Sequence, residues 1–156
     1  LPMLLSHYKM LAWVGYQGAV QYPGVVIPTQ SDADKYPQYA SFHKTTYNAD
    51  RIMGEMSNAA SDGRNAGLAV HCGEFGCSKN VAEAMRLAWF TDMVAAMEAN
   101  NIPWTLWECL DGGFGFVDME YGIYRINCPL LKVLTGKELT DAEAKGLLQK
   151  YGFKTE

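Results

Sequence analysis

The chain has 156 residues and a net charge of −4, and 49% of its residues are hydrophobic against 19% charged, a composition typical of a folded globular protein. The negative charge argues against a nucleic-acid partner, because phosphate binding needs an excess of lysine and arginine. No run approaches the roughly 18 apolar residues of a transmembrane helix, so no membrane association is expected. The sequence contains no internal repeat or low-complexity tract.

Residues 17–46 predict a long loop, because prolines and glycines recur through them, as in Tyr22-Pro23-Gly24 and Tyr36-Pro37. Aromatic residues in and beside this loop could form platforms for a sugar, although such side chains more often pack a loop against the protein: Trp13, Tyr16, Tyr22, Tyr36, Tyr39 and Tyr47. The next segment, from Asn48 to Ala60, predicts a helix with Ile52 and Met56 facing inward.

The segment around Glu74 is the most informative in the chain. Residues 68–70 are a short apolar run after the turn signal Asp62-Gly63, which predicts a strand buried on both faces, as in a parallel sheet. Glu74 follows the end of this strand, between Gly73 and Gly76, where the backbone can turn sharply and a ligand can approach closely. Because active sites of parallel α/β proteins form where strands end, Glu74 is a candidate catalytic residue, the alternative being a solvated loop glutamate.

A long helix from Asn80 to Asn101 is expected next, with Asn80 as the N-cap and Glu83 as its capping-box partner. Its main apolar stripe consists of Leu87, Phe90, Val94 and Met97. The run at residues 102–107 then predicts a second strand, so that strand, helix and strand form a βαβ unit. Glu74 and Trp107 should therefore emerge at the same rim of a parallel sheet.

A tryptophan beside a carboxylate indicates sugar chemistry, since an indole face stacks on a pyranose while the carboxylate attacks or stabilises the anomeric carbon. Alternation along the strand places Trp104 and Trp107 on opposite faces, which makes Trp104 a core residue and leaves Trp107 for the sugar. Glu108 could hydrogen-bond a sugar hydroxyl or could be a simple exposed loop residue.

The tail predicts two helices. The first runs from Pro129 to Leu134 and is stopped by Gly136, and the second begins at Thr140 with Glu143 in the capping-box position. The cysteines have no C-x-x-C spacing: Cys72, Cys77, Cys109 and Cys128. Buried free thiols or one disulfide are the main alternatives, and a zinc site with His71 has only weak support because the spacing is irregular.

These motifs together resemble the last third of a glycoside hydrolase family 5 enzyme, the cellulase family of (β/α)8 barrels. The matching residues, in order, are Gly73-Glu74-Phe75-Gly76, Arg86 within an amphipathic helix, residues 102–108 and Phe114-Gly115. The resemblance implies that Glu74, at the end of the seventh strand, is the catalytic nucleophile. It also implies that Trp107, at the end of the eighth strand, lines the sugar subsite beside the scissile bond.

The first residues resemble the sixth strand of the same family. That strand ends in a histidine, one residue and a tyrosine, with Gln-Gly-Ala some ten residues later, and here His7 and Gln17-Gly18-Ala19 match. The family tyrosine falls at Lys9, so Tyr8 is the nearby candidate for the hydroxyl that supports the nucleophile. The expected site is therefore Glu74, His7 and Tyr8 for catalysis, with Trp107, Glu108 and Trp13 for substrate binding.

By this resemblance, residues 1–156 are one C-terminal part of an α/β barrel, with about three βα units. The general acid/base glutamate of the family follows the fourth strand, which this chain lacks, and a substitute such as Glu108, Asp111, Asp118 or Glu120 would need special placement. The chain alone is therefore expected to be inactive. It would need the missing N-terminal half or a second copy of itself as a partner.

The resemblance also implies a secreted endo-β-1,4-glucanase that needs no cofactor or metal and acts on a β-glucan polysaccharide or oligosaccharide, its signal peptide lying on the missing part. A β-mannanase or a xyloglucanase of the same family stays open. The non-enzyme alternative is an incomplete fragment that only binds β-glucan or self-assembles. A different enzyme on a doubly wound sheet would need a phosphate loop or a nucleophile elbow, and the sequence contains neither.

Overall fold

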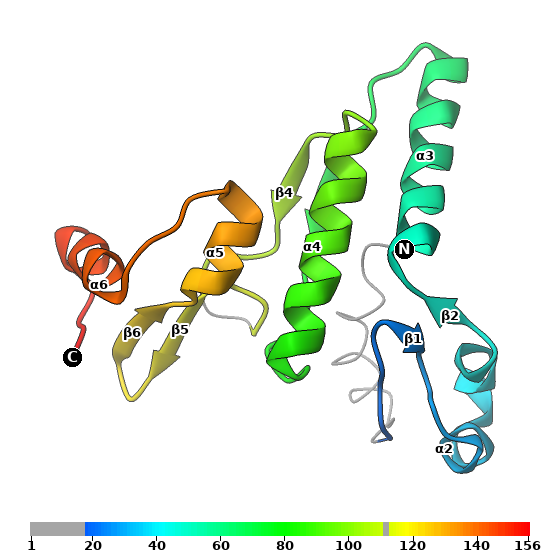
Figure 1. Cartoon of the computed structure of the whole chain (residues 1–156), viewed down its shortest axis with the longest axis horizontal. Helices are drawn as coiled ribbons and strands as arrows, with labels where there is room; N and C mark the ends of the chain where they lie inside the picture. Colours follow the sequence, from blue (N-terminus) through cyan, green and yellow to red (C-terminus); the bar gives the residue numbers. More distant parts are fainter. Residues whose placement is uncertain (1–17, 111–112) are drawn as a thin grey trace.

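The computed structural model describes residues 18–110 and 113–156, which form a mixed α/β arrangement. Helix α4 (Glu83–Ala99) lies between helix α3 (Ala49–Ala66) and helix α5 (Cys128–Thr135), and it packs against both (Figure 1). Within these described ranges, no helix combines the length and the apolar character of a membrane span.

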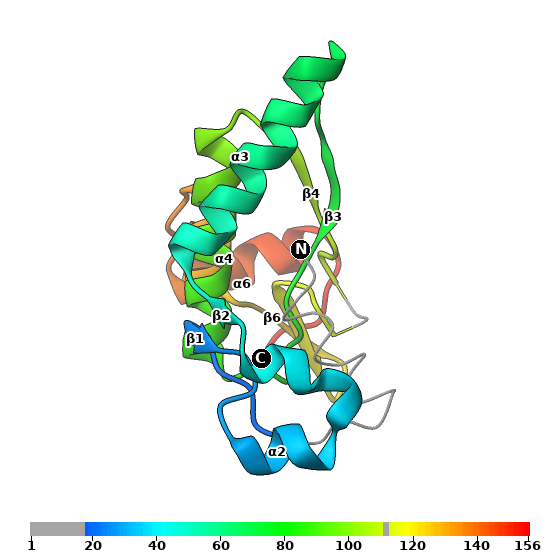
Figure 2. The same ribbon diagram turned by 90° about the vertical axis from the view of Figure 1, so that its right-hand side faces the viewer.

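One parallel strand-helix-strand unit forms the centre of the fold. Strand β3 (Cys72–Phe75) and strand β4 (Trp104–Leu106) pair in parallel, and α4 is the crossover between them. Helices α3 and α4 lie on one side of this pair (Figure 2). The βαβ unit expected from the sequence is therefore present.

Strand β3 begins later than expected, and the prediction of a buried strand at residues 68–70 is wrong. Leu68 is 69% exposed. Helix α3 does not stop at Ala60 but continues to Ala66, and Gly67 then adopts a left-handed conformation with φ 67°. Because the N–H of Leu68 donates to the carbonyl of Gly63 (2.9 Å), the residues after the helix complete its cap instead of starting a strand.

Asn48 caps α3 as expected, its side chain accepting from the N–H of Arg51. The start of α4, in contrast, differs from the prediction. Asn80 lies in a turn, and the helix begins at Glu83 after Ala82, which makes no side-chain cap bond. The carboxylate of Glu83 instead accepts from Asn127 (3.0 Å), so the expected capping-box partner links α4 to the residue before α5.

The expected loop at residues 17–46 contains two short helices in its described part. They are α2 (Gln30–Lys35), capped by the Thr29 hydroxyl, and the 3-10 helix η1 (Pro37–His43). Strands β1 (Gly24–Val25) and β2 (Thr46–Tyr47) pair antiparallel at its base. Tyr22, Tyr36 and Tyr47 are buried, so these aromatics pack the segment and offer no face to a sugar.

The C-terminal part adds a hairpin that the sequence analysis did not predict. Strands β5 (Val117–Glu120) and β6 (Ile123–Ile126) pair antiparallel around Tyr121 and Gly122, which both have positive φ (50° and 77°), as a two-residue hairpin turn requires. Helix α5 follows and ends at Gly136 as expected. Helix α6 (Asp141–Lys150) has the expected capping box of Thr140 and Glu143.

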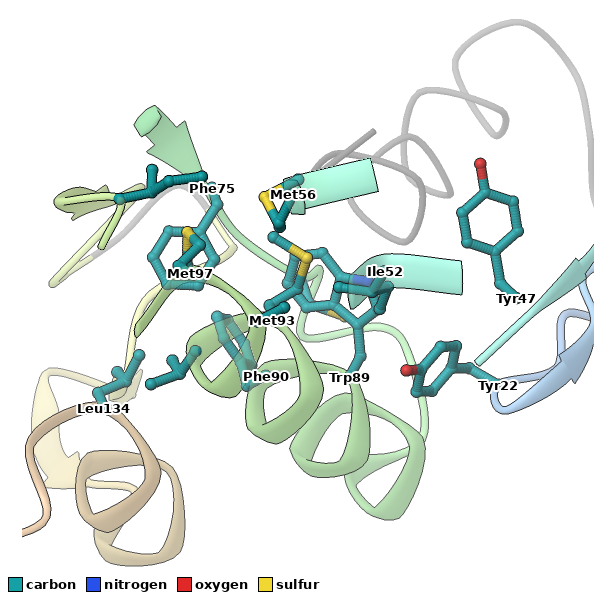
Figure 3. Packing of buried hydrophobic residues seen from close by; sticks show 14 of the residues in the cluster. Tyr22, Tyr47, Ile52, Met56, Phe75, Trp89, Phe90, Met93, Met97 and Leu134 are labelled. Carbon is teal, nitrogen blue, oxygen red and sulfur yellow. The ribbon is translucent and has the colours of Figure 1, made fainter. Parts of the chain in front are cut away.

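The core gathers around one face of α4 (Figure 3). Phe75 of β3 contacts three aromatic rings at centroid distances of 5.1 to 6.2 Å: Trp104, Phe90 and Trp89. Helix α3 contributes Ile52 and Met56, which were expected to face inward. The predicted apolar stripe of α4 is correct at Phe90, Val94 and Met97, whereas Leu87 is only half-buried.

Tyr22 anchors the first described segment to α4, and its replacement by phenylalanine should lower the stability of the chain. The hydroxyl of Tyr22 donates to the carboxylate of Asp92 at 2.5 Å, and burial, reinforced by this bond, raises the pKa of the tyrosine. Tyr22→Phe removes a hydrogen bond to a charged group, which costs about 1.5–3 kcal/mol in the free energy of unfolding. Urea titration followed by circular dichroism measures this loss, and a change below about 0.5 kcal/mol would contradict the role given to the bond.

Candidate active site

A β-bulge determines which way Glu74 faces. Cys72 pairs with Trp104 and Phe75 pairs with Leu106, so β3 uses three steps where β4 uses two. Both Cys72 and Phe75 consequently pack toward the helices, although residues three apart in a regular strand would face opposite ways. The extra residue falls at Gly73-Glu74, and the exposed Glu74 belongs to the face of the pair opposite to α3 and α4.

The face of β3 and β4 opposite to α3 and α4 carries polar and aromatic residues. Beside Glu74 it holds Thr105, whose hydroxyl lies 3.3 Å from Nε2 of His71, the residue just before β3. In the part of the chain that the structure describes, the Glu74 carboxylate makes no hydrogen bond or ion pair. The Glu74 side chain is exposed.

Trp107 emerges on the same face, directly after β4. Its indole is 52% exposed, whereas Trp104 turns to the opposite side and packs edge-on against Phe75 at a centroid distance of 5.1 Å. The expectation that the two tryptophans face opposite ways is confirmed. The backbone N–H of Trp107 donates to the carbonyl of Phe75 (2.8 Å), which ties the end of β4 to the residue after Glu74.

Gly76 allows the two strand ends to approach each other. A Cβ at this position would lie 2.1 Å from the carbonyl oxygen of Trp107, a contact that no side chain can make without displacing the backbone. From the sequence, the glycines beside Glu74 were expected to allow a sharp turn and the close approach of a ligand. At Gly76 the structural reason is the close approach of the backbone of Trp107 itself.

Glu108 adds a second carboxylate beside Trp107, and the peptide bond between these two residues is cis. One carboxylate oxygen, Oε1, is buried and has no hydrogen-bond partner within the described ranges. Burial and, secondarily, the negative charge of Glu108 raise the pKa of the neighbouring Cys109 thiol. Because an ionised carboxylate accepts hydrogen bonds, Glu108 can accept one from a hydroxyl group of a ligand that stacks on Trp107.

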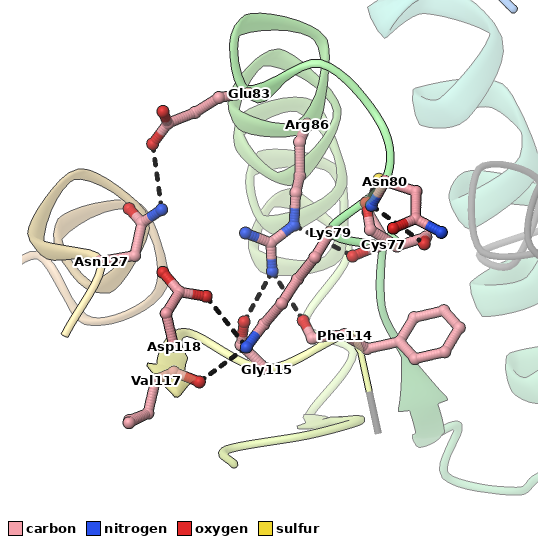
Figure 4. A network of polar contacts seen from close by, with 11 residues as sticks. Cys77, Lys79, Asn80, Glu83, Arg86, Phe114, Gly115, Val117, Asp118 and Asn127 are labelled. Atoms are coloured by element: carbon pink, nitrogen blue, oxygen red, sulfur yellow. Dashed lines mark hydrogen bonds and ion pairs between the residues drawn. The ribbon is translucent and has the colours of Figure 1, made fainter. Parts of the chain in front are cut away.

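Two basic residues tie together the loops that follow β3 and β4 (Figure 4). The buried guanidinium of Arg86, in the first turn of α4, donates to the carbonyls of Cys77 (3.0 Å), Phe114 (2.7 Å) and Gly115 (2.7 Å). Lys79 donates to the carbonyl of Val117 (2.6 Å) and pairs with Asp118 (2.9 Å). Asp118 is thus engaged in an ion pair, and it is not a free acid of the site.

The family model of cellulases, glycosyl hydrolase family 5, matches residues 21–113, more than half of the chain. The chain belongs to glycosyl hydrolase family 5. The cellulase family and the fold of part of an α/β barrel, expected from the sequence motifs, are confirmed. No curated protein matches the sequence.

Solved structures of family 5 character share the fold. A crystal structure described as a glycoside hydrolase superposes with a TM-score of 0.58 and 23% identity, covering 88% of this chain and 39% of its own length. The cellulose synthase subunit Z of Clostridioides difficile superposes with a TM-score of 0.51 and 19% identity, covering 76% of this chain and 31% of its own length. For Cel5A of Thermotoga maritima, solved with cellobiose, the TM-score is 0.50 and the identity 23%, with 55% of this chain and 27% of Cel5A covered. For a Cel5A structure with mannotriose, the TM-score is 0.51 and the identity 20%, with 61% of this chain and 31% of that structure covered.

The chain thus spans between 27% and 39% of the length of these structures. Its α3, β3, α4, β4 and α5 form a portion of a (β/α)8 barrel, and the residues described close no barrel. Of the site residues expected in this family 5 chain, three belong to the described part of the structure. Glu74, Trp107 and Glu108 gather at the carboxyl ends of neighbouring strands, whereas His7, Tyr8 and Trp13 lie outside the described residues.

The four cysteines of the family 5 chain are free. Of the alternatives left open by the sequence, the structure shows free thiols and no disulfide between these cysteines, but only Cys77 is buried, so the expected burial is wrong for Cys72, Cys109 and Cys128. Cys77 is fully buried, and burial raises the pKa of its thiol to about 12, which keeps it neutral. Across residues 18–110 and 113–156, no three potential metal ligands come together, and His71 contacts Thr105.

The contacts that Lys79 and Arg86 make with distant segments were not predicted from the sequence. The signal for Arg86 was present, because it interrupts a helix face whose other members are apolar, namely Trp89, Phe90, Met93 and Met97. A buried arginine at such a position needs several acceptors. Which carbonyls provide them depends on two distant loops, and no local pattern shows this.

Proposed function

We propose that this chain carries the nucleophile and part of the sugar-binding surface of a retaining endo-β-1,4-glucanase. The observation that supports the proposal is the bulge at Gly73-Glu74, which turns the carboxylate to the face of the sheet from which Trp107 emerges. A ring stacked on the indole at the end of β4 would have its anomeric carbon near the end of β3. This arrangement supports Glu74 as the group that attacks it.

In the proposed reaction the carboxylate of Glu74 attacks the anomeric carbon and the glycosidic C–O bond breaks. A second carboxylic acid donates its proton to the departing oxygen, then removes a proton from the water that hydrolyses the glycosyl-enzyme ester. The two carboxyl groups must stand about 5–5.5 Å apart for this mechanism. We assign the second group to a part of the barrel outside this chain, and we assign Glu108 to sugar hydroxyls.

His7 and Tyr8 are proposed to order the nucleophile and the sugar, with Trp13 as a further binding residue, on the strength of the sequence motif alone. The substrate proposed is a β-1,4-glucan. A β-mannan is the second candidate, because a protein of similar fold, Cel5A of Thermotoga maritima, has been solved with both cellobiose and mannotriose. Secretion is proposed because a polymeric glucan lies outside the cell, and the appearance of the protein in culture medium tests this.

Replacing Trp107 by alanine should weaken the binding of cellotetraose about tenfold, because loss of the stacking surface costs roughly 1.4 kcal/mol. The half-exposed indole makes little contribution to the core, so the fold should persist. Calorimetric titration of the chain with cellotetraose measures the change. The same titration with mannotetraose ranks the two substrate classes.

Tyr121→Ala provides the matched control, since Tyr121 is also an exposed aromatic residue (94%) but lies at the tip of the β5–β6 hairpin. It should leave cellotetraose affinity unchanged. Equal affinity in the Trp107→Ala chain and the unmodified chain would show that the indole is not a sugar platform, and the proposed site would then be wrong.

A further inference from the structure

Two loops govern where the proposed sugar-binding residues stand. The first, residues 76–82, leaves β3 just after Glu74, and the second, residues 107–116, leaves β4 and includes Trp107 and Glu108. Neither stretch is helix or strand apart from the single bridge residue Leu110, in the part the structure describes. Their relative position must therefore come from contacts between them.

Arg86 supplies a direct link between both loops. It is only 4% exposed, and its guanidinium bonds one carbonyl of the first loop, that of Cys77, and two of the second, those of Phe114 and Gly115 (Figure 4). The planar fork of an arginine can serve acceptors on two sides at once, which a lysine ammonium on its flexible stem does less well.

The contacts of Arg86 are transmitted to Trp107 and Glu108 through the backbone. Gly115 lies so close to the second loop's own start that a Cβ there would be 2.4 Å from the carbonyl oxygen of Cys109 and 3.0 Å from that of Glu108. Gly76 approaches the carbonyl oxygen of Trp107 in the same way. When the guanidinium holds residues 114–115 and Cys77, it therefore also fixes the peptides on which the two site residues are built.

A buried cation is a costly way to fill this space. Burial lowers the pKa of Arg86, and the contact of its guanidinium with the ring of Phe90, 5.5 Å from the centroid, accounts for only a small part of the cost of burying a charge. What an apolar residue cannot do is bond three carbonyls of two loops. The use of an arginine here indicates that the placement of the loops matters beyond packing.

We infer that Arg86 is a positioning residue of the active site, which holds Trp107 and Glu108 in register with Glu74. The inference rests on the proposed function for its consequence, which is the affinity for a β-glucan chain. The geometry is independent of the proposed function, because Arg86 links the two loops whatever the ligand is.

The test compares Arg86→Met, which keeps the length of the side chain and loses every donor, with Arg86→Lys, which keeps the charge. Cellotetraose affinity should fall about tenfold to a hundredfold in Arg86→Met, because small misplacements of binding groups have effects of this size, and should fall less in Arg86→Lys. Acrylamide quenching of Trp107 fluorescence should increase as the second loop loosens. The Trp107 signal is obtained by comparing each chain with its Trp107→Phe counterpart.

Tyr22→Phe is the matched control, since it also removes a side-chain hydrogen bond made at α4, the one to Asp92, but this bond involves neither loop. Below its unfolding midpoint it should keep the affinity and the quenching of the unmodified chain. If Arg86→Met also keeps the affinity and the quenching of the unmodified chain, the inference is wrong and the arginine serves stability alone. If Arg86→Met does not fold, unmodified affinity and quenching in Arg86→Lys would overturn the inference, and changes in both would support it.

The failure of the proposed function has a different signature. In that case Trp107→Ala leaves cellotetraose affinity unchanged, while Arg86→Met still alters the quenching of Trp107. Unchanged quenching in the Arg86 variants, together with a loss of affinity in Trp107→Ala, overturns the positioning role and leaves the sugar site in place.

Discussion

Hydrolysis of a β-glucan by the complete barrel is expected to fall by about 10⁴-fold or more when Glu74 is replaced by glutamine, because an amide cannot attack the anomeric carbon. Folding should be unaffected. Glu74 is exposed, and its carboxylate has no partner among the residues described, so the substitution removes no stabilising contact. The measurement is the initial rate on carboxymethylcellulose, alongside the thermal unfolding midpoint.

A second variant identifies the role of Glu74 as a nucleophile. Glu74→Ala opens space for azide, which should attack an activated aryl β-cellobioside in its place and release the α-glycosyl azide, an inverted product visible by NMR. Glu120→Gln, an exposed carboxylate of the β5–β6 hairpin, should keep full activity. Near-normal turnover in Glu74→Gln would exclude Glu74 as the nucleophile.

The isolated 156-residue chain is expected to show no turnover, since the proposed mechanism assigns the general acid/base to a part of the barrel outside this chain. Steady hydrolysis by the purified chain would show that its second carboxylate comes from the chain itself or from another copy. Size-exclusion chromatography of the same sample then separates these two sources. An inactive chain that still binds cellotetraose would agree with the binding-only alternative for the isolated material.

Sequence reasoning could place the central unit because its signals are local. A helix with one apolar stripe between two short β-forming runs predicts a parallel βαβ unit, although the run at residues 68–70 placed its first strand too early. Simple alternation from Trp104 predicts the outward direction of Trp107. Asn48, Gly136 and Thr140 mark helix ends through bonds to residues three or four positions away. These features need no knowledge of distant segments.

Other features depend on the partners of a segment, and the sequence could not show them. Regular alternation gives the wrong side for either Cys72 or Phe75, because the bulge arises only when β3 pairs with β4. Gly63 looked like part of a turn, but it lies within α3, and a glycine is needed there because Val70 occupies the space that a Cβ would fill. The bonds of Arg86 join residues 28 and 29 positions away along the chain.

Gly76→Ala is expected to lower the free energy of unfolding by about 1–3 kcal/mol, because the new methyl group overlaps the carbonyl oxygen of Trp107 and the strand ends must separate. The adjacent bond from the N–H of Trp107 to the carbonyl of Phe75 should weaken with them. Since that bond joins the peptides beside Glu74 and Trp107, cellotetraose affinity should fall in parallel with stability. Urea unfolding and calorimetric titration of one sample measure both effects.

Gly73→Ala separates this steric effect from the general effect of adding a methyl group near Glu74, since no described atom lies within 4 Å of a Cβ at position 73. It should change stability by less than about 1 kcal/mol, the usual range for exchanging glycine and alanine without a clash. Equal losses in the two variants would mean that the glycines act through backbone flexibility. A loss confined to Gly76→Ala would show that the close approach of β3 and β4 ends builds the site, so that the position of Trp107 is set by the strand carrying the proposed nucleophile.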